Sequence, residues 1–355
     1  MVSRVSQITS YLRIGGTDVL MIGICGMSGI GKTTIARVVY DSFSDQFEGC
    51  SFLANVGEVA QRCSLHSLQE KLLSDIIGRD IGISDIQRGV NVIESFLHRS
   101  RILLVLDGVS QLDQLAMLAG DCDWFGPGSR IIITTVAMDL LTRHGVDRIY
   151  IPKPLNKDEA LYLFSLKCFI SGPPSKDYVE MSNDFLYYAA GLPLVIEVLG
   201  SFLFNRNITE WKNTLDKLQA CHGPSVLNIL QIIFDGLDET EKEAFLDIAC
   251  FFNGEDKDRV VEILEFLYTG FDLRNFIAKS LVRVSSNNQL WMHDQLQLLG
   301  KAIVNEAKEP GKCSRLWMHE DIDNVLRENT VRVSVQILNK SIDLVLLYIK
   351  KINTL

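Results

Sequence analysis

The stretch VLMIGICGMSGIGKTT, residues 19–34, decides the fold of this protein. Its first six residues, 19–24, are apolar apart from one glycine, which is typical of a buried strand. The loop that follows reads Gly26-Met27-Ser28-Gly29-Ile30-Gly31-Lys32-Thr33-Thr34. After it, apolar residues recur at helical spacing, at Ile35, Val38, Val39 and Phe43. Strand, glycine-rich loop and helix in this order predict a loop that binds a phosphate chain with its backbone N–H groups.

Two side chains of this loop and one later acid are the candidate phosphate and metal ligands. Lys32 is placed to reach the β- and γ-phosphates of a nucleotide, and the Thr33 hydroxyl to bind Mg²⁺. The apolar run LLVLD, residues 103–107, ends in Asp107, which we predict to hold the same Mg²⁺ directly or through water. The residues alone leave a simpler alternative open, in which the loop is an ordinary turn and the acid merely ends a strand.

Further strand and helix patterns predict an α/β domain over residues 1–154. Besides 19–24, the expected strands cover residues 50–54, 102–106, 130–134 and 148–151. Amphipathic helical patterns alternate with them, which favours a parallel sheet covered on both faces. Pro152 and Pro154 end the last strand, so we place the first domain boundary there.

The sequence pattern predicts mainly α-helical structure for the rest of the chain, residues 155–355. We predict a small helical domain over 155–224, a winged-helix domain over 225–320 and a divergent tail over 321–355. Asn156 and Glu159 form a capping-box pattern at the first helix. In the predicted winged-helix domain, we expect helices over 239–252, 256–266 and 273–278. They precede a hairpin of strands 281–284 and 289–292, and another helix follows the hairpin. In the tail, the residue pattern predicts an edge strand and an amphipathic helix. This tail would either dock on the rest of the protein or form a surface for a membrane or a partner.

Composition excludes several classes of protein. With 355 residues, 47% hydrophobic and 22% charged, the chain suits two or three folded domains of about 100–200 residues each. Its net charge of −9 opposes non-specific nucleic-acid binding. No apolar run approaches membrane-spanning length and no signal peptide opens the chain, so we expect no stable membrane insertion. The eight cysteines lack metal-site spacing and are expected to be reduced core thiols, at positions 25, 50, 63, 122, 168, 221, 250 and 313.

Six runs, taken in order, resemble a known family. They are residues 27–34, 103–107, 128–135 (GSRIIITT), 191–194 (GLPL), 245–252 (FLDIACFF) and 292–294 (MHD). This series is similar to the NB-ARC region of plant disease-resistance proteins, which are STAND P-loop NTPases, and covers roughly residues 1–330. Residues 245–252 and 47–50 (FEGC) point to the subclass with a TIR domain before this region and leucine-rich repeats after it, neither of which this sequence contains.

The resemblance implies a cytoplasmic, or cytoplasmic and nuclear, switch in plant immune signalling. ADP would hold the domains closed, and exchange for ATP would open them for association with like or related NBS-LRR chains. By motif, Thr134 and Thr135 would line the phosphate site, Pro193 would pack near the adenine and His293 would reach the β-phosphate of ADP. Asp294 would help to fix the closed arrangement; the alternative is a strand end and helix cap, with Asp294 as N-cap.

Three departures from the family pattern bear on the mechanism. Gly108 stands where the family has a second acid that can polarise the attacking water, and Val136 where it has a basic γ-phosphate sensor. The start Val2-Ser3-Arg4 is similar to the remnant of a segment that packs against the adenine. We therefore expect nucleotide binding with at most slow ATP hydrolysis. An AAA+-like ATPase and a truncated regulatory partner of full-length receptors are the alternatives.

Overall fold

The computed structural model describes residues 2–169, 176–221, 225–285, 287–305 and 315. The chain divides into two compact units, Met1–Pro154 and Leu155–Leu355, which are treated separately below. The tail over 321–355 and Cys313 lie outside the described residues. Within the described part of the chain, no helix is long and apolar enough to cross a membrane.

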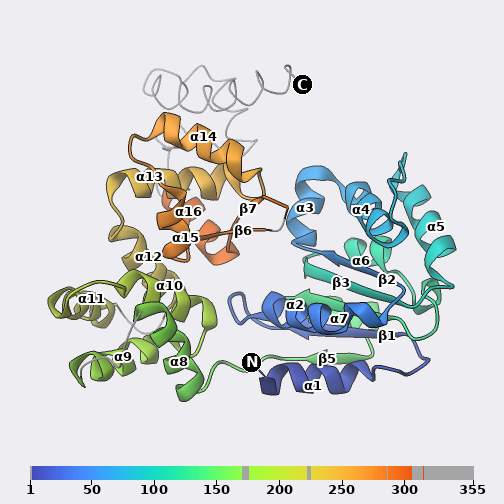
Figure 1. Ribbon diagram of the computed structural model, residues 1–355, viewed down its shortest axis with the longest axis horizontal. Helices are drawn as coiled ribbons and strands as arrows, with labels where there is room; N and C mark the ends of the chain where they lie inside the picture. Colours follow the sequence, from blue (N-terminus) through green and yellow to red (C-terminus); the bar gives the residue numbers. More distant parts are fainter. Residues whose placement is uncertain (1, 170–175, 222–224, 286, 306–314, 316–355) are drawn as a thin grey trace. The chain divides into compact units, whose positions relative to one another are not determined.

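A five-stranded parallel sheet forms the centre of the first unit (Figure 1). Its strands are β1 (Leu20–Cys25), β2 (Gly49–Leu53), β3 (Ile102–Val109), β4 (Arg130–Thr135) and β5 (Arg148–Tyr150). They lie in the order β2-β3-β4-β1-β5, and each neighbouring pair is parallel. The prediction of an α/β unit with a parallel sheet is confirmed, and no strand end differs from its predicted position by more than three residues.

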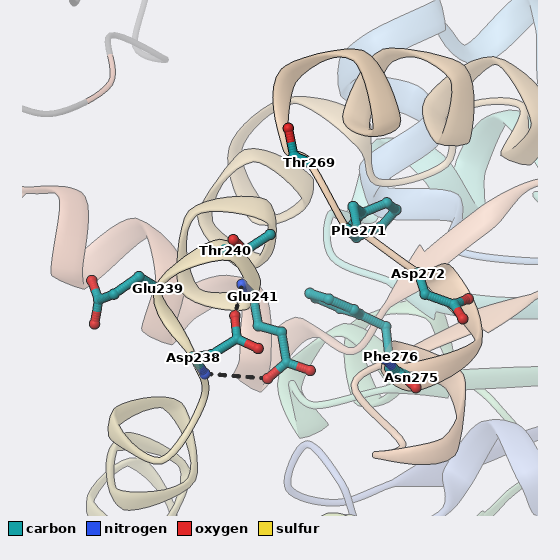
Figure 2. Close-up of a pocket in the computed structure, with 10 residues that line it drawn as sticks. Asp238, Glu239, Thr240, Glu241, Thr269, Phe271, Asp272, Asn275 and Phe276 are labelled. Atoms are coloured by element: carbon teal, nitrogen blue, oxygen red, sulfur yellow. Dashed lines mark hydrogen bonds between the residues drawn. The ribbon is translucent and has the colours of Figure 1, made fainter.

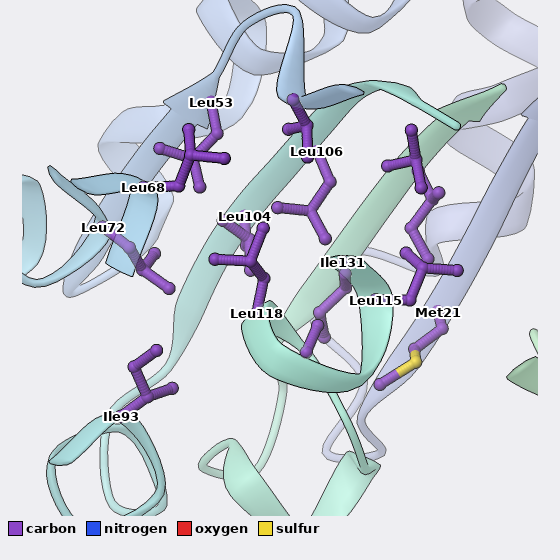
Figure 3. Packing of buried hydrophobic residues seen from close by; sticks show 14 of the residues in the cluster. Met21, Leu53, Leu68, Leu72, Ile93, Leu104, Leu106, Leu115, Leu118 and Ile131 are labelled. Atoms are coloured by element: carbon purple, nitrogen blue, oxygen red, sulfur yellow. The ribbon is translucent and has the colours of Figure 1, made fainter. Parts of the chain in front are cut away.

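Helices cover both faces of this sheet because each strand is apolar on both sides. Leu103 and Val105 of β3 join one buried cluster with α1 (Val2–Leu12) and α2 (Lys32–Phe43). Leu104 and Leu106 point the opposite way, into a second cluster (Figure 3). Its helices are α3 (Val56–Cys63), α4 (Leu65–Ile77), α5 (Ile86–Leu97), α6 (Leu112–Leu118) and α7 (Met138–His144). Short 3₁₀ turns, η1 (Ser44–Gln46) and η2 (Cys122–Trp124), complete the unit.

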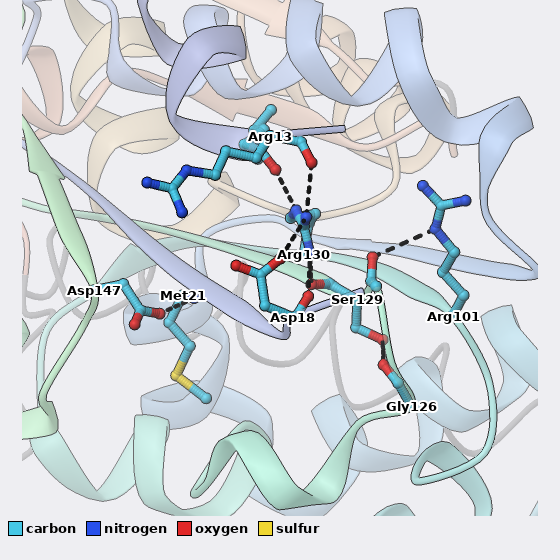
Figure 4. Close-up of polar contacts among 10 residues, drawn as sticks. Arg13, Asp18, Met21, Arg101, Gly126, Ser129, Arg130 and Asp147 are labelled. Atoms are coloured by element: carbon cyan, nitrogen blue, oxygen red, sulfur yellow. Dashed lines mark hydrogen bonds and ion pairs between the residues drawn. The ribbon is translucent and has the colours of Figure 1, made fainter. Parts of the chain in front are cut away.

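Helix α1 is fastened to the sheet by Arg130, whose side chain is fully buried (Figure 4). The guanidinium donates to the carbonyl oxygens of Leu12, of Arg13 at 2.8 Å and of Asp18, and pairs with the Asp18 carboxylate at 3.2 Å. Burial lowers the pKa of Arg130, and the Asp18 carboxylate opposes that shift. A buried cation surrounded by acceptors is stable only when they are all in place, so this cluster fixes where the helix ends.

The second unit is mainly helical. Its helices are α8 (Lys157–Cys168), α9 (Lys176–Ala189), α10 (Pro193–Leu203), α11 (Ile208–Ala220), α12 (Val226–Asp235), α13 (Glu239–Asp247), α14 (Lys257–Leu267), α15 (Leu273–Ala278) and α16 (Asp294–Asn305). The antiparallel strands β6 (Val282–Val284) and β7 (Leu290–Met292) form the predicted hairpin. The capping box of Asn156 and Glu159 is present at the start of α8.

One predicted helix differs from the structure. The sequence predicts a continuous helix over 239–252, whereas α13 ends at Asp247 and gives way to a π-helical turn, η3 (Ile248–Phe252). Helix α16 packs on this turn so closely that a β-carbon at Gly300 would lie 2.6 Å from the Ala249 side chain. The wider π turn thus coincides with the place where the two helices approach, which helical periodicity alone does not reveal.

Candidate nucleotide-binding site

The glycine-rich loop lies between β1 and α2, at the carboxyl end of a central strand. Gly29 and Gly31 have φ of 82° and 95°, left-handed values that a β-carbon disfavours. Ile30 is buried between them and anchors the loop. Gly31 is the N-cap of α2 and has no side chain, so the first N–H groups of the helix are left to an incoming anion.

Lys32 reaches back over this loop. Its ammonium Nζ donates to the carbonyl oxygens of Gly26 at 2.8 Å and Met27 at 3.1 Å. Lys32 is half-buried, while the neighbouring Thr33 and Thr34 are exposed. The loop therefore holds one positive charge against the carbonyl oxygens at its start, and this charge can serve as the counter-charge of a phosphate chain.

The predicted site residues Thr33 and Thr134 meet at a third one, Asp107, although the three are far apart in sequence. The hydroxyl groups of Thr33 and Thr134 both donate to Asp107 Oδ1, at 2.8 Å and 2.6 Å. Asp107 is 1% exposed and comes from β3, while Thr134 comes from the neighbouring β4. The carboxylate is thus fixed beside the first turn of α2, next to the hydroxyl predicted to share a metal ion with it.

The oxygen atoms of Thr33 and Asp107 fit Mg²⁺, which prefers hard oxygen ligands. Within the described residues, no group of three or more His, Cys, Asp or Glu side chains gathers to hold a metal ion. The described residues therefore provide no complete set of metal ligands from these side chains alone. A Mg²⁺ ion here would take its remaining ligands from nucleotide phosphates and water, as it usually does in phosphate-binding sites.

Thr135 is placed differently from Thr134. Its hydroxyl donates to the Val109 carbonyl at 2.7 Å and accepts the Ala137 N–H at 3.1 Å. The single proton of each threonine hydroxyl is therefore engaged, that of Thr134 on Asp107 and that of Thr135 on the backbone. In this geometry the end of β4 offers no threonine proton to a γ-phosphate, and the next residue, Val136, is apolar and 62% exposed.

Gly108 has a role that the sequence analysis missed. The register between β3 and β4 shifts between Leu106 and Val109, and Gly108 lies in this bulge with φ of 72°. Its N–H donates to Thr134 Oγ1 at 2.8 Å. The bulge thus turns Asp107 toward Thr33 while Gly108 itself is exposed. The Asp-Gly pair inside an apolar strand was the available signal for it.

Pro193, His293 and Asp294 belong to the second unit. Pro193 opens α10 directly after Leu192, the N-cap. His293 precedes α16, and its Nδ1 accepts the Gln295 N–H at 3.2 Å. In a neutral imidazole the ring proton is then on Nε2, which becomes the donor atom. The alternative of a strand end followed by a capped helix is present, since β7 ends at Met292 and α16 begins at Asp294. The capping residue is His293 and not the predicted Asp294, because the first N–H groups of α16 donate to His293.

A cavity of about 270 Å³ in the second unit has different chemistry (Figure 2). Its lining includes four carboxylates, those of Asp238, Glu239, Glu241 and Asp272. Three of them pair with lysine or arginine side chains, and Asp238 caps α13 through the Glu241 N–H at 2.8 Å. No lysine or arginine is among the described residues that line this cavity, so it lacks the cation that a phosphate chain needs, and the nucleotide site remains the loop after β1.

Comparison with known proteins agrees with this geometry. Residues 2–172 match the NB-ARC domain family, and residues 238–308 match the Disease resistance protein Roq1-like, winged-helix domain. The chain is 39% identical to TMV resistance protein N of Nicotiana glutinosa, over 94% of this chain and 30% of the relative. It is also 39% identical to Disease resistance protein RUN1 of Vitis rotundifolia, over 91% of this chain and 25% of the relative. The chain thus spans less than a third of these relatives.

A solved structure shows a similar fold. It is the crystal structure of a STAND (Signal Transduction ATPase with Numerous Domains) protein with a tetratricopeptide repeat sensor from Pyrococcus horikoshii. The TM-score is 0.50 at 15% sequence identity, over 95% of this chain and 49% of the other. At this identity the likeness concerns the fold alone.

Proposed function

The chain belongs to the NB-ARC family of P-loop proteins, and we propose that it is a nucleotide-operated switch of plant disease-resistance signalling that binds ADP in one state and ATP in the other. One observation carries the proposal: Lys32 lies over a glycine-rich loop whose next residue, Thr33, is hydrogen-bonded to the buried Asp107. These groups supply the phosphate donors, the counter-charge and the metal ligands that a Mg²⁺-nucleotide needs.

The switching itself would come from the second unit. A ligand shifts an equilibrium between two arrangements only if it binds one of them better. Pro193 against the adenine and the Nε2–H donor of His293 on the β-phosphate would create this difference for ADP. Both residues lie at helix starts, where their positions are fixed by the backbone of α10 and α16.

The test is direct. Purified protein is denatured, and the released nucleotide is identified by chromatography. Stoichiometric ADP supports a closed switch, whereas an empty site that also fails to take up added ADP or ATP contradicts nucleotide binding.

Hydrolysis is expected to be slow, since Gly108 offers no base beside Asp107. We predict single-turnover rates well below the ~1 s⁻¹ of typical enzymes. In Gly108→Asp the rate should rise toward the about 10²–10⁴-fold that a positioned base contributes. The site has room for a side chain, because the nearest atom to an added β-carbon is Asn55 Cα at 3.5 Å. Aspartate and asparagine also tolerate left-handed backbone better than most residues.

Gly108→Asn is the matched control for this experiment, because it has the same shape and the same backbone strain without a base. Equal and fast rates in the wild type and Gly108→Asp would contradict the proposal and favour the second candidate, an AAA+-like ATPase. Glycine at position 108 weighs against an AAA+-like ATPase, because it supplies no base beside Asp107.

The proposed switch also has consequences for the partners of the protein and for its location in the cell. We propose that the ATP-bound form associates with further copies or with related NBS-LRR chains in the cytoplasm or nucleus, and that nucleic acid is not a partner. Size-exclusion chromatography with ADP and with ATP distinguishes these states. Co-purification with a full-length receptor, without self-association on adding ATP, would instead favour the regulatory-partner alternative.

A further inference from the structure

Two residues of β3 face a single residue of β4 beside the phosphate loop. The register of the two strands shifts between Leu106 and Val109, so that Asp107 and Gly108 both lie opposite Thr134. A bulge of this kind leaves the extra residue without its ladder hydrogen bond, and bulges are rare between parallel strands. They are over-represented next to active sites, where they turn a side chain in a new direction. The side chain that is turned here is the carboxylate of Asp107.

The hydroxyl group of Thr134 takes the place of the missing ladder hydrogen bond. The Gly108 N–H donates to Thr134 Oγ1 at 2.8 Å, and the hydroxyl donates its own proton to Asp107 Oδ1 at 2.6 Å. Thr134 is 1% exposed, so both contacts are made inside the protein. A valine of the same shape would leave the Gly108 N–H and the buried carboxylate each with one partner fewer.

The hydroxyl groups of Thr33 and Thr134 donate to the same carboxylate oxygen but differ in what else they can bind. Thr33 is exposed in the first turn of α2, and its oxygen lone pairs can bind a metal ion while its proton stays on Asp107. Thr134 is buried, and one of its lone pairs already accepts the Gly108 N–H. Thr33 is therefore suited to touch the ligand, and Thr134 to hold the carboxylate.

The position of β4 in the sheet gives Thr134 this task. β4 lies between β3, which carries the acid, and β1, which leads into the phosphate loop (Figure 1). Thr134 pairs with Ile24, one residue before the end of β1. The two neighbouring strands are thus held in register at this residue, and the bulge between β3 and β4 sets the direction of Asp107.

We propose that Thr134 is a positioning residue for the metal ion of the bound nucleotide, acting through Asp107 and the bulge without touching the γ-phosphate. This rests on the proposed function, in which Thr33 and Asp107 share a Mg²⁺ ion. It replaces the expectation that Thr134 itself lines the phosphate site. Side chains that orient a metal ligand typically change metal affinity by about 10- to 100-fold when they are removed.

The experiment compares Thr134→Val, Thr134→Ser and Thr135→Val in the full chain. The valine removes the hydroxyl group of residue 134 and the serine keeps it. Thr135→Val is the matched control, because Thr135 is also 1% exposed in β4 but donates to the Val109 carbonyl. Calorimetric titration measures the affinities for ADP and for ATP in EDTA and at a series of Mg²⁺ concentrations. Amide hydrogen exchange at Gly108 is measured in the nucleotide-free protein.

In Thr134→Val we expect the Mg²⁺ concentration that gives half of the metal-dependent gain in affinity to rise by about 10- to 100-fold. The rise should be the same for ADP and ATP, and both affinities in EDTA should equal those of the wild type. Thr134→Ser and Thr135→Val should keep the wild-type dependence on Mg²⁺. Weaker binding of ATP alone, in EDTA as well as in Mg²⁺, would show that Thr134 contacts the γ-phosphate and would overturn the proposal. A wild-type affinity that does not depend on Mg²⁺ would also overturn it.

Amide exchange at Gly108 tests the bulge without any ligand. It should be faster in Thr134→Val and unchanged in Thr135→Val, because only the first variant removes the acceptor of the Gly108 N–H. Unchanged exchange in Thr134→Val would overturn the proposal whatever the protein binds. If Thr134→Val does not fold, Thr134→Cys, whose thiol is a weak donor, takes its place with the same expected directions.

The wild type separates this proposal from the proposed function. A wild type that takes up neither ADP nor ATP contradicts the proposed function, and the role of Thr134 in metal binding falls with it. If the wild type binds both nucleotides and Thr134→Val keeps the wild-type dependence on Mg²⁺, only the role of Thr134 is wrong.

Discussion

Lys32→Ala is expected to lose retained ADP and to weaken nucleotide affinity by about 10- to 100-fold. A charge-assisted hydrogen bond to phosphate contributes about 1.5–3 kcal/mol, and each 1.4 kcal/mol is a factor of ten. Lys32 is the cation placed over the loop, with Nζ within hydrogen-bonding distance of two loop carbonyls. Its removal leaves the backbone donors of α2 without the counter-charge that a phosphate chain needs.

Nucleotide content after denaturation and calorimetric titration with ADP measure this effect. Lys212→Ala is the matched control, because Lys212 is an exposed lysine of α11 in the second unit. The thermal midpoint of the nucleotide-free protein should change little in both variants, since the Lys32 side chain is not part of a buried cluster. If Lys32→Ala still retains ADP like the wild type, the assignment of the phosphate loop is wrong.

The sheet could be predicted from the sequence because strands that are buried on both faces need apolar residues at every position. Such strands are recognised as continuous apolar runs. Leu103 to Leu106 alternate between the two clusters, and no polar residue interrupts them until Asp107. The phosphate loop could be predicted because only glycine adopts the left-handed backbone of positions 29 and 31 without strain. Both signals are local, so a single sequence carries them.

Helix α1 and the caps of α16 could not be predicted in the same way. Helix α1 has 11 residues, and its end is set by Arg130, more than a hundred residues away in sequence. The bulge at Gly108 depends on the pairing of β3 with β4. At 293–294 two adjacent residues could both cap a helix, and the choice of His293 depends on where β7 ends. Tertiary contacts decide each of these cases.

Arg315→Leu is expected to destabilise the second unit by about 3–5 kcal/mol, the usual cost of removing one partner from a buried ion pair. Arg315 is 5% exposed, and its Nε donates to the carboxylate of Asp247, which is 2% exposed. Its Nη2 donates to the Glu243 carbonyl at 2.8 Å and pairs with the Glu243 carboxylate at 3.1 Å. Burial alone would lower the pKa of Arg315, but Asp247 and Glu243 outweigh it and raise the pKa.

The cost arises because Asp247 would remain buried with its charge uncompensated. Its second oxygen accepts the Tyr268 hydroxyl, and burial together with this carboxylate raises the Tyr268 pKa, so the tyrosine stays neutral and cannot replace the cation. Urea unfolding of the full chain measures the loss. For a unit of this size, each 1 kcal/mol lowers the thermal midpoint by about 2–4 °C.

The double variant Arg315→Leu with Asp247→Leu separates an unpaired charge from lost packing. If the buried charge is the cause, the double variant should be clearly more stable than Arg315→Leu alone, because replacing both members of a buried pair by apolar residues is often neutral or better. Arg283→Leu is the surface control: it breaks the exposed pair with Glu197 and should cost about 0–1 kcal/mol. A wild-type unfolding midpoint in Arg315→Leu would show that this residue does not anchor the chain on α13.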